Sequence, residues 1–245
     1  MTVFRSHHVR ILLMSCCLSF LVSCASTGVT SISEDDDALE KFNKTSYNVT
    51  DWVDEFFLKP VATGYQTVMP DPAERAVSRA FGNIDEIGTA ANSLLQGKFS
   101  QAANDTARVL TNSTIGVLGL FEVAEGIGLE KNQPEDFGQT LAVWGVPSGS
   151  YFYIPFLGPS TVRDTPSRFV DWLLNPISYV DDQTDRYILS GVDLIQTRAS
   201  LLEDERLISG DRYLFLKDAY LQRREYLIND GRIEDDFEDD FDTDF

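Results

Sequence analysis

The sequence predicts an all-α fold on three observations. Apolar residues recur at spacings of three and four in most segments between residues 38 and 229, as on one face of a helix. No alternation of apolar and polar residues, which would mark half-buried strands, is sustained over several segments. An uncharged run at 109–121 has thirteen residues, whereas a helix needs about 20 to cross a bilayer. That run is therefore too short to span a membrane as one helix.

Residues 1–23 have the pattern of a cleaved lipoprotein signal peptide. Arg5 and Arg10 supply the positive start, and 11–22 is an apolar stretch of signal length. It ends in Leu-Val-Ser-Cys, a bacterial lipobox, in which the small Ser permits cleavage and the thiol of Cys24 receives a diacylglyceryl group. The alternative is a short buried helix that happens to end in Cys. The arginines and the position at the extreme N-terminus favour the signal.

Cleavage before Cys24 decides which chemistry is available. Removal of 23 of the 245 residues leaves 222, and with them go both histidines and two of the three cysteines. No disulfide, Cys/His zinc site, Ser–His–Asp triad or Cys–His pair can then be built from one chain. We therefore predict no catalytic residue, no metal ligand, and no cofactor beyond the diacylglyceryl and N-acyl lipid on Cys24. The protein is predicted not to be an enzyme.

The chain is strongly acidic. Its 39 Asp and Glu outnumber 20 Lys and Arg, for a net charge of −19; the signal carries two positive charges and no acid, so the mature value is −21. This argues against nucleic acid as a partner and against charge-driven adhesion to anionic lipid. Attachment would be hydrophobic, since each buried CH₂ of an acyl chain contributes about 0.8 kcal/mol. Ala25, where Asp is the usual inner-membrane retention signal, directs the protein to the outer membrane.

A polar tether at 24–37 precedes the predicted helical body at 38–230. The first helix begins after Asp37, a candidate capping residue, and Pro60 and Gly64 interrupt its pattern. Further helices are predicted at 73–81, 84–95, 99–110, 167–174, 186–202 and 211–229.

Two apolar segments lie between these helices. For a soluble protein, 109–121 is best interpreted as a buried core hairpin, in which Gly116 and Gly119 let backbones approach; the glycines suit a membrane-facing hairpin equally. Segment 145–166 interleaves Gly, Pro and aromatic residues and would be a liability if fully solvated. It must be buried in the protein, lie in a membrane interface, or line an apolar passage.

The last helix and the tail carry opposite charges. The predicted helix at 211–229 has an apolar stripe opposite a basic cluster that includes Arg223 and Arg224, which is either a solvated face or a docking surface. The tail at 231–245 has eight acids among its last twelve residues and Phe at every fourth position. It is predicted to be disordered in isolation and either docks on a basic groove of a partner or only solubilises the chain.

Motifs for common chemistries are missing from the sequence. There is no P-loop, GxGxxG fingerprint, HExxH or EF-hand spacing. The acids at 181–185 could hold a hard cation, but they lack the Gly and the bidentate Glu of a calcium loop.

An ordered set of short motifs resembles the MlaA/VacJ family of outer-membrane lipoproteins. The resemblance covers about residues 37–230, and its specificity lies in the order of the motifs rather than in any one of them. The matching runs are DALEKFN at 37–43, LKPVA at 58–62, GY at 64–65, NSLLQGK at 92–98, NSTIG at 112–116, GLF at 119–121, DFGQTL at 136–141, WGV at 144–146, PFLGPS at 155–160 and RD at 163–164. The acidic tail is not part of this pattern.

The resemblance implies a ring of in-plane amphipathic helices in the inner leaflet of the outer membrane, around a central amphipathic channel. Such proteins are understood to remove mislocalised phospholipids from the outer leaflet and pass them to a soluble periplasmic carrier, MlaC, and to associate with trimeric porins. We adopt that function as the prediction. A lipid-anchored scaffold that organises porins without moving lipid is the alternative, and a phospholipase using carboxylates or serine alone is a third.

The candidate site residues follow from the two apolar segments and the basic helix. Arg163 is the natural phosphate contact, although its neighbour Asp164 could simply pair with it. Arg223 and Arg224, or the acidic tail, are candidates for carrier docking. The candidate channel residues are Asn112, Ser113, Thr114, Gly116, Ser160, Arg163 and Asp164.

Overall fold

A computed structural model describes residues 34–232. The predicted signal peptide, Cys24, the first part of the tether (24–33) and residues 233–245 of the acidic tail lie outside the described residues. Contacts divide the chain between Ala38 and Leu39 into two units. The described part of the second unit, 39–232, holds every element after α2 and all of α2 beyond its first residues.

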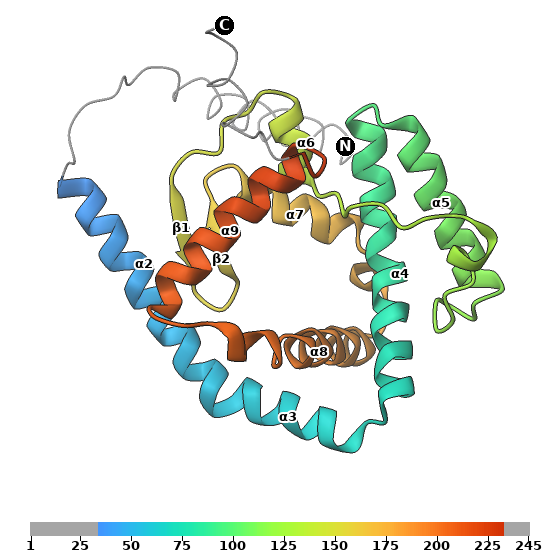
Figure 1. The fold of residues 1–245 in the computed structure, drawn as a ribbon, viewed down its shortest axis with the longest axis horizontal. Coiled ribbons are helices and arrows are strands. Elements are labelled where there is room, and N and C mark those ends of the chain that lie inside the picture. Colours follow the sequence, from blue (N-terminus) through green and yellow to red (C-terminus); the bar gives the residue numbers. More distant parts are fainter. Residues whose placement is uncertain (1–33, 233–245) are drawn as a thin grey trace, which may run out of the picture. The chain divides into compact units, whose positions relative to one another are not determined.

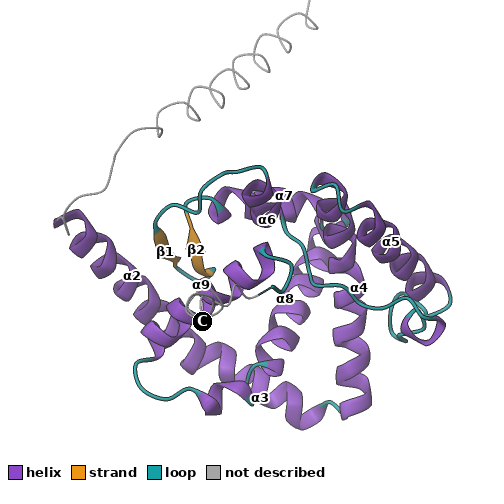
Figure 2. Cartoon of the chain, turned by 45° about the horizontal axis from the view of Figure 1, so that its top comes forward, coloured by secondary structure: helices purple, strands orange, loops and turns teal. Residues whose placement is uncertain are grey.

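The described residues are mainly helical, as predicted, with one short β-hairpin added (Figures 1 and 2). The helices are α2 (Glu34–Val53), α3 (Lys59–Val68), α4 (Asp71–Leu95), α5 (Phe99–Thr114), α6 (Phe137–Val143), α7 (Asp164–Leu174), α8 (Gln183–Ser200) and α9 (Arg212–Ile228). A π-helix (Asp54–Leu58) and three 3₁₀ turns (Glu125–Ile127, Pro176–Tyr179, Asp204–Leu207) join them, and the strands are β1 (Tyr151–Ile154) and β2 (Gly158–Thr161).

Proline and glycine interrupt the chain less than the sequence suggests. Pro60 occupies the first turn of α3, where a missing N–H is tolerated, and the π-helix before it takes up the change of register. The helices predicted at 73–81 and 84–95 are one helix, α4, which continues through Gly82. The division was wrong because α4 buries a mostly polar face, which a search for apolar periodicity does not detect.

The hairpin is fastened to α2 by Asn43. This buried amide accepts a hydrogen bond from the Tyr153 backbone N–H at 2.8 Å and donates one to the Tyr151 carbonyl at 3.3 Å. Beside it, the rings of Tyr47, Tyr153 and Tyr213 form an aromatic core, with Tyr47 5.6 Å from each of the other two. Elements far apart in sequence, α2, β1 and α9, are thereby joined.

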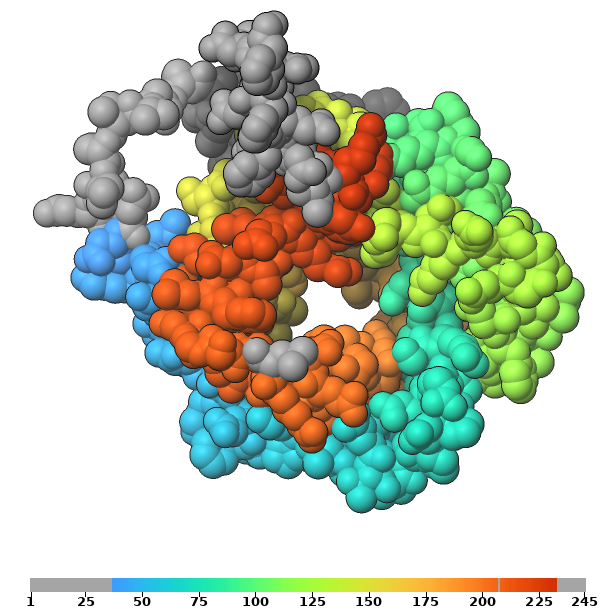
Figure 3. All heavy atoms as spheres, viewed as in Figure 1, coloured from blue at the N-terminus to red at the C-terminus, as the bar shows by residue number. Residues whose placement is uncertain are grey.

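The other helices close the second unit through helix pairs. Helices α4 and α5 form an antiparallel pair, with α5 on the side of α4 away from α7, α8 and α9 (Figures 1 and 2). Helix α8 packs against α3 and also contacts α4. The space-filling view shows the unit hollowed at its centre, with α4, α8 and α9 around the opening (Figure 3).

Candidate functional site

The described residues bury polar side chains and expose apolar ones, the reverse of a water-soluble protein. The largest fully buried side chains are polar: Arg108, Gln139, Asn43, Asn92, Asn112, Thr140, Thr161, Asp105, Ser93 and Ser160. Large apolar side chains on almost every element are exposed instead. An apolar surface of this extent is a binding surface for lipid or protein rather than an ordinary solvated exterior.

Aromatic residues make up much of this surface. Each of the three tryptophans is more than half exposed and lies against a phenylalanine, and such amphipathic rings are typical of membrane–water interfaces. The ring centroids are 5.3 Å apart for Trp52 and Phe56, 6.0 Å for Trp144 and Phe137, and 5.8 Å for Trp172 and Phe169.

None of the helices in residues 34–232 is long and apolar enough to cross a membrane. The exposed apolar side chains are distributed over helices and turns of the described residues.

The turn after α5 is the most apolar exposed segment. Ile115, Val117, Leu118, Leu120 and Phe121 are all exposed, Leu118 by 72%. Of the two interpretations of 109–121, the buried core hairpin is therefore wrong and the outward-facing hairpin fits: α5 ends at Thr114 and the turn projects its side chains outward. Val117 and Leu118 both adopt positive φ, 54° and 59°, which costs energy for side chains with a Cβ.

The candidate residues at 112–116 support this turn. The side chain of Asn112 accepts hydrogen bonds from the backbone N–H groups of Val123 and Ala124, both at 2.9 Å. Ser113 accepts one from Asn83 at 2.9 Å, and Thr114 is exposed with its hydroxyl bonded to a carbonyl of its own helix. Gly116 is required sterically, because a Cβ there would collide with backbone oxygens of Asn112 and Phe121.

A buried ion cluster lies under the same turn. The guanidinium of Arg108, 1% exposed, pairs with Glu86 on α4 and with Glu122 at 3.0 Å, and also donates to the Leu129 carbonyl. Burial raises the pKa of Glu86, although the Arg108 charge opposes that shift. Sequence reasoning missed this cluster, because Arg108 and its partners fall in no recognisable motif.

The candidate residues at 160–164 form a buried corner between β2 and α7. Ser160 shares a 2.8 Å hydrogen bond with Thr165, and Arg163 donates to Asp164 at 2.8 Å. The structure thus shows the pairing of Arg163 with Asp164 that the sequence left open. Asp164 also accepts hydrogen bonds from Tyr220 at 2.7 Å and from Arg224 at 3.0 Å. Burial acts to raise the pKa of Asp164, but these donors overcome it and hold that pKa below its usual value.

The chain was compared with known proteins. The MlaA lipoprotein family model matches residues 35–227. This chain belongs to the MlaA lipoprotein family. It is 34% identical to the intermembrane phospholipid transport system lipoprotein MlaA of Escherichia coli (strain K12), over 88% of this chain and 87% of that one. The protein of the same name in Haemophilus influenzae is 29% identical, over 87% and 88%.

A solved structure from work on the structural basis for maintenance of bacterial outer membrane lipid asymmetry shares the fold. Its TM-score is 0.69 at 31% identity, and the match covers 78% of this chain and 98% of that one. The resemblance inferred from the ordered motifs and the helical fold predicted from it are therefore confirmed.

In this MlaA family chain, the two groups of candidate channel residues lie apart. Asn112, Ser113, Thr114 and Gly116 belong to the end of α5, on the far side of α4 from β2 and α7, where Ser160, Arg163 and Asp164 lie (Figure 1). The seven residues therefore do not form one common surface. Only Thr114 exposes a hydroxyl, and most of the others make structural contacts.

Two carboxylates that the sequence reasoning did not select, Asp85 and Asp171, have raised pKa values. Asp85 on α4 reaches solvent, yet the protein around it and the charge of Asp193 on α8 raise its pKa to about 6. Asn175 donates to the Asp85 carboxylate at 3.4 Å. Asp171 on α7, which accepts a hydrogen bond from the Phe137 backbone N–H at 2.8 Å, likewise has its pKa raised by burial to about 6. Spacing alone does not bring these acids together.

The two arginines predicted for docking have different positions. Arg224 points inward and pairs with Asp136 and Asp164, and its pKa is raised by those carboxylates against the effect of burial. Arg223, its neighbour, is exposed. The placement leaves Arg223 rather than Arg224 at the surface.

Acids within residues 34–232 form no cluster suited to a metal ion. The acids at 181–185 lie at the N-terminal end of helix α8 instead. The carboxylate of Asp182 caps that helix by accepting hydrogen bonds from the Thr184 and Asp185 backbone N–H groups, at 2.7 and 3.1 Å.

Proposed function

We propose that this chain is a non-enzymatic lipoprotein that removes mislocalised phospholipids from the outer leaflet of the outer membrane and passes them to a soluble periplasmic carrier of the MlaC type. One observation carries the proposal: helices with buried polar side chains and exposed apolar side chains surround an opening, and none of those in residues 34–232 spans a membrane. The transport system and the lipid asymmetry named for its relatives support it.

The polarity of the unit suits a protein seated in one leaflet. Exposed side chains such as Phe56, Leu118 and Phe156 would contact acyl chains, and the acylated Cys24 would add a covalent anchor. The net charge does not oppose this seating, because the contact is hydrophobic. A trimeric porin is the proposed neighbour in the membrane.

The opening suits passage of an amphipathic molecule. Helices α4 and α8, which carry Asp85 and Asp193, border the opening (Figure 3), and polar groups on such helices would offer a hydrated path for a headgroup while the acyl chains stay beside apolar side chains. No bond is made or broken in such transfer, so the absence of histidine from the mature chain is no obstacle. Arg223, together with the tail at 231–245, is proposed to meet the carrier.

Seating in lipid is tested by tryptophan fluorescence, because Trp52, Trp144 and Trp172 are the only tryptophans and all three are exposed. In vesicles that contain brominated phospholipid we expect strong quenching, with little quenching by aqueous acrylamide. The reverse pattern would exclude a body embedded in the leaflet.

Transfer is tested in cells with a membrane-impermeant amine label that reports phosphatidylethanolamine in the outer leaflet. Loss of the protein should raise the label and its return should lower it. Photo-crosslinkers at 112–121 and 155–164 should capture phospholipid at exposed positions such as Leu118 and Phe156. If the label does not change and only porin is captured, the chain acts as a scaffold. If lysolipid or free fatty acid appears, it is a phospholipase.

A further inference from the structure

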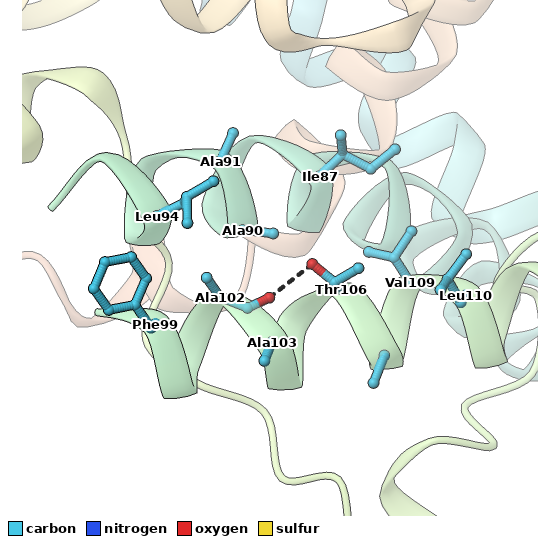
Figure 4. A pocket seen from close by; sticks show the side chains of 11 residues that line it. Ile87, Ala90, Ala91, Leu94, Phe99, Ala102, Ala103, Thr106, Val109 and Leu110 are labelled. Atoms are coloured by element: carbon cyan, nitrogen blue, oxygen red, sulfur yellow. Dashed lines mark hydrogen bonds between the residues drawn. The ribbon is translucent and has the colours of Figure 1, made fainter. Parts of the chain in front are cut away.

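An apolar groove runs between α4 and α5, on the side of α4 away from the other helices that border the opening (Figures 1 and 4). Its volume is about 700 Å³. The lining residues are Ile87, Ala90, Ala91 and Leu94 of α4, and Phe99, Ala102, Ala103, Thr106, Ala107, Val109 and Leu110 of α5. None of them is charged; Ala90 and Ala102 lie between the two helices, with larger apolar side chains toward both ends of the groove (Figure 4).

The groove has no polar group left to satisfy. Its one hydroxyl, on Thr106, donates to the Ala102 carbonyl of its own helix at 2.7 Å, as Figure 4 shows. A bound extended peptide would bury backbone N–H and C=O groups without partners, which is costly, whereas a hydrocarbon chain needs none. From Phe99 at one end to Leu110 at the other, α5 rises about 16 Å. The groove therefore fits an extended acyl chain.

At Phe99 the groove meets a polar pocket of about 670 Å³, which Phe99 also lines. Lys98 in this pocket pairs with two carboxylates, Glu135 at 2.8 Å and the half-exposed Asp230. A cation beside exposed carboxylate oxygen is complementary to a headgroup that carries both charges, with its phosphate toward Lys98 and its ammonium toward Asp230. A purely apolar ligand would offer no charged group to Lys98 and Asp230 in this pocket.

The groove also continues into the exposed apolar surface of the unit. Leu94, Phe99 and Leu110 stand at its edges and are all more than half exposed. A lipid could therefore enter sideways, without crossing a polar barrier.

We propose that the α4–α5 groove and its polar pocket bind one zwitterionic phospholipid, with an acyl chain in the groove and the headgroup at Lys98 and Asp230. This site is separate from the central opening, and it rests on the proposed seating of the protein in lipid. It would hold a lipid beside the ring rather than within it.

The test uses the full acylated chain in vesicles that contain phosphatidylethanolamine with a photoreactive group in one acyl chain. Adducts should concentrate on peptides covering 87–110. Substituting two of the lining alanines, Ala103→Phe and Ala107→Phe, should lower them at least about tenfold, because the added rings occupy space that the acyl chain needs. Ala219→Phe, at an exposed position on α9, is the matched control and should leave them unchanged.

Several results would overturn the proposal. One is adducts spread evenly over the exposed surface, or unchanged in the doubly substituted variant. Another is capture of a porin rather than lipid by a photo-crosslinker at position 103 in cells. Equal competition by unlabelled phosphatidylglycerol and phosphatidylethanolamine would refute the headgroup assignment. Tryptophan quenching by brominated lipid in the same samples separates the two proposals: quenching without adducts refutes the groove, and no quenching refutes the seating.

Discussion

The turn after α5 and the corner between β2 and α7 are both held by buried polar side chains, but the support differs. Under the turn, Asn112 and Arg108 bond chiefly to the loop that follows α5, so the cluster shapes a local, outward-facing tip. At the corner, Asp164 collects donors from Arg163, Tyr220 and Arg224, so it ties α7 to α9. In both regions, the side chains that resemble ligand contacts in sequence form the framework, and the apolar side chains around them form the surface.

The largest expected effect is at the turn. Arg108→Met removes the cation that Glu86 and Glu122 share, while Glu86 stays buried. Breaking a buried pair in this way costs about 3–5 kcal/mol of unfolding free energy. Urea unfolding followed by circular dichroism in detergent measures it. Arg79→Met, at an exposed site on α4, is the control and should change stability by less than about 0.5 kcal/mol. Equal effects of the two substitutions would mean that the cluster is not structural.

The corner should give a smaller loss. Arg224→Met removes charged hydrogen bonds to Asp136 and Asp164, and the net loss should be about 1.5–3 kcal/mol, because Asp136 is partly exposed and Asp164 keeps its donors Arg163 and Tyr220. Its neighbour Arg223 is exposed, so Arg223→Met should leave the unfolding free energy nearly unchanged and instead weaken binding of the periplasmic carrier. If Arg224→Met alone weakened carrier binding while stability was unchanged, the assignment of the two arginines would be reversed.

The sequence predicted the helices of these two regions better than the burial of their side chains, for a physical reason. Apolar residues at spacings of three and four located α5 and α9; in α9 the spaced residues Tyr213 and Leu227 are buried. The run 109–121 was singled out as unusual, but its residues alone did not decide between a buried and a membrane-facing hairpin. Burial of apolar residues is the rule for proteins in water, and this surface breaks that rule. The same inversion hid Arg108 and Asn112 as buried supports.

The hairpin and the continuous α4 show a second limit. The strand residues 151–154 sit among Gly and Pro, and their pairing depends on Asn43, more than 100 residues away. The polar face of α4, with Asn83, Glu86 and Asn92 buried, is recognisable only once its partners are in place. The family resemblance identified the fold as a whole, but not these contacts.

A third experiment concerns the strain at the tip. Val117 has a φ of 54°, which glycine adopts without the cost of about 1 kcal/mol that a β-branched residue pays. Val117→Gly should therefore stabilise the protein in detergent by up to that amount while weakening its binding to vesicles. Val143→Gly, at an exposed residue of helix α6, should instead destabilise by about 1 kcal/mol. Destabilisation by both would show that no strain is stored in the turn.

The smallest expected effect is a change in pH dependence, which separates Asp85 on α4 from Asp164 at the corner. The pKa of Asp85 is raised to about 6, so between about pH 4 and 6 the native state binds more protons than the unfolded state. The unfolding free energy therefore falls as pH rises through this window, and Asp85→Asn should flatten that fall. Asp171, with a pKa also near 6, should retain part of it.

Asp164 should respond with the opposite sign. Because its pKa is held below the usual value, its carboxylate stabilises the native state above about pH 4, and this contribution is lost as pH falls through the native pKa. Asp164→Asn should thus lower stability at pH 7 and reduce the loss on acidification. Unfolding curves from pH 3 to 7 compare both variants with the wild type. If Asp85→Asn kept the wild-type slope, the Asp85 carboxylate would be ordinarily solvated, and burial and the charge of Asp193 would not raise its pKa.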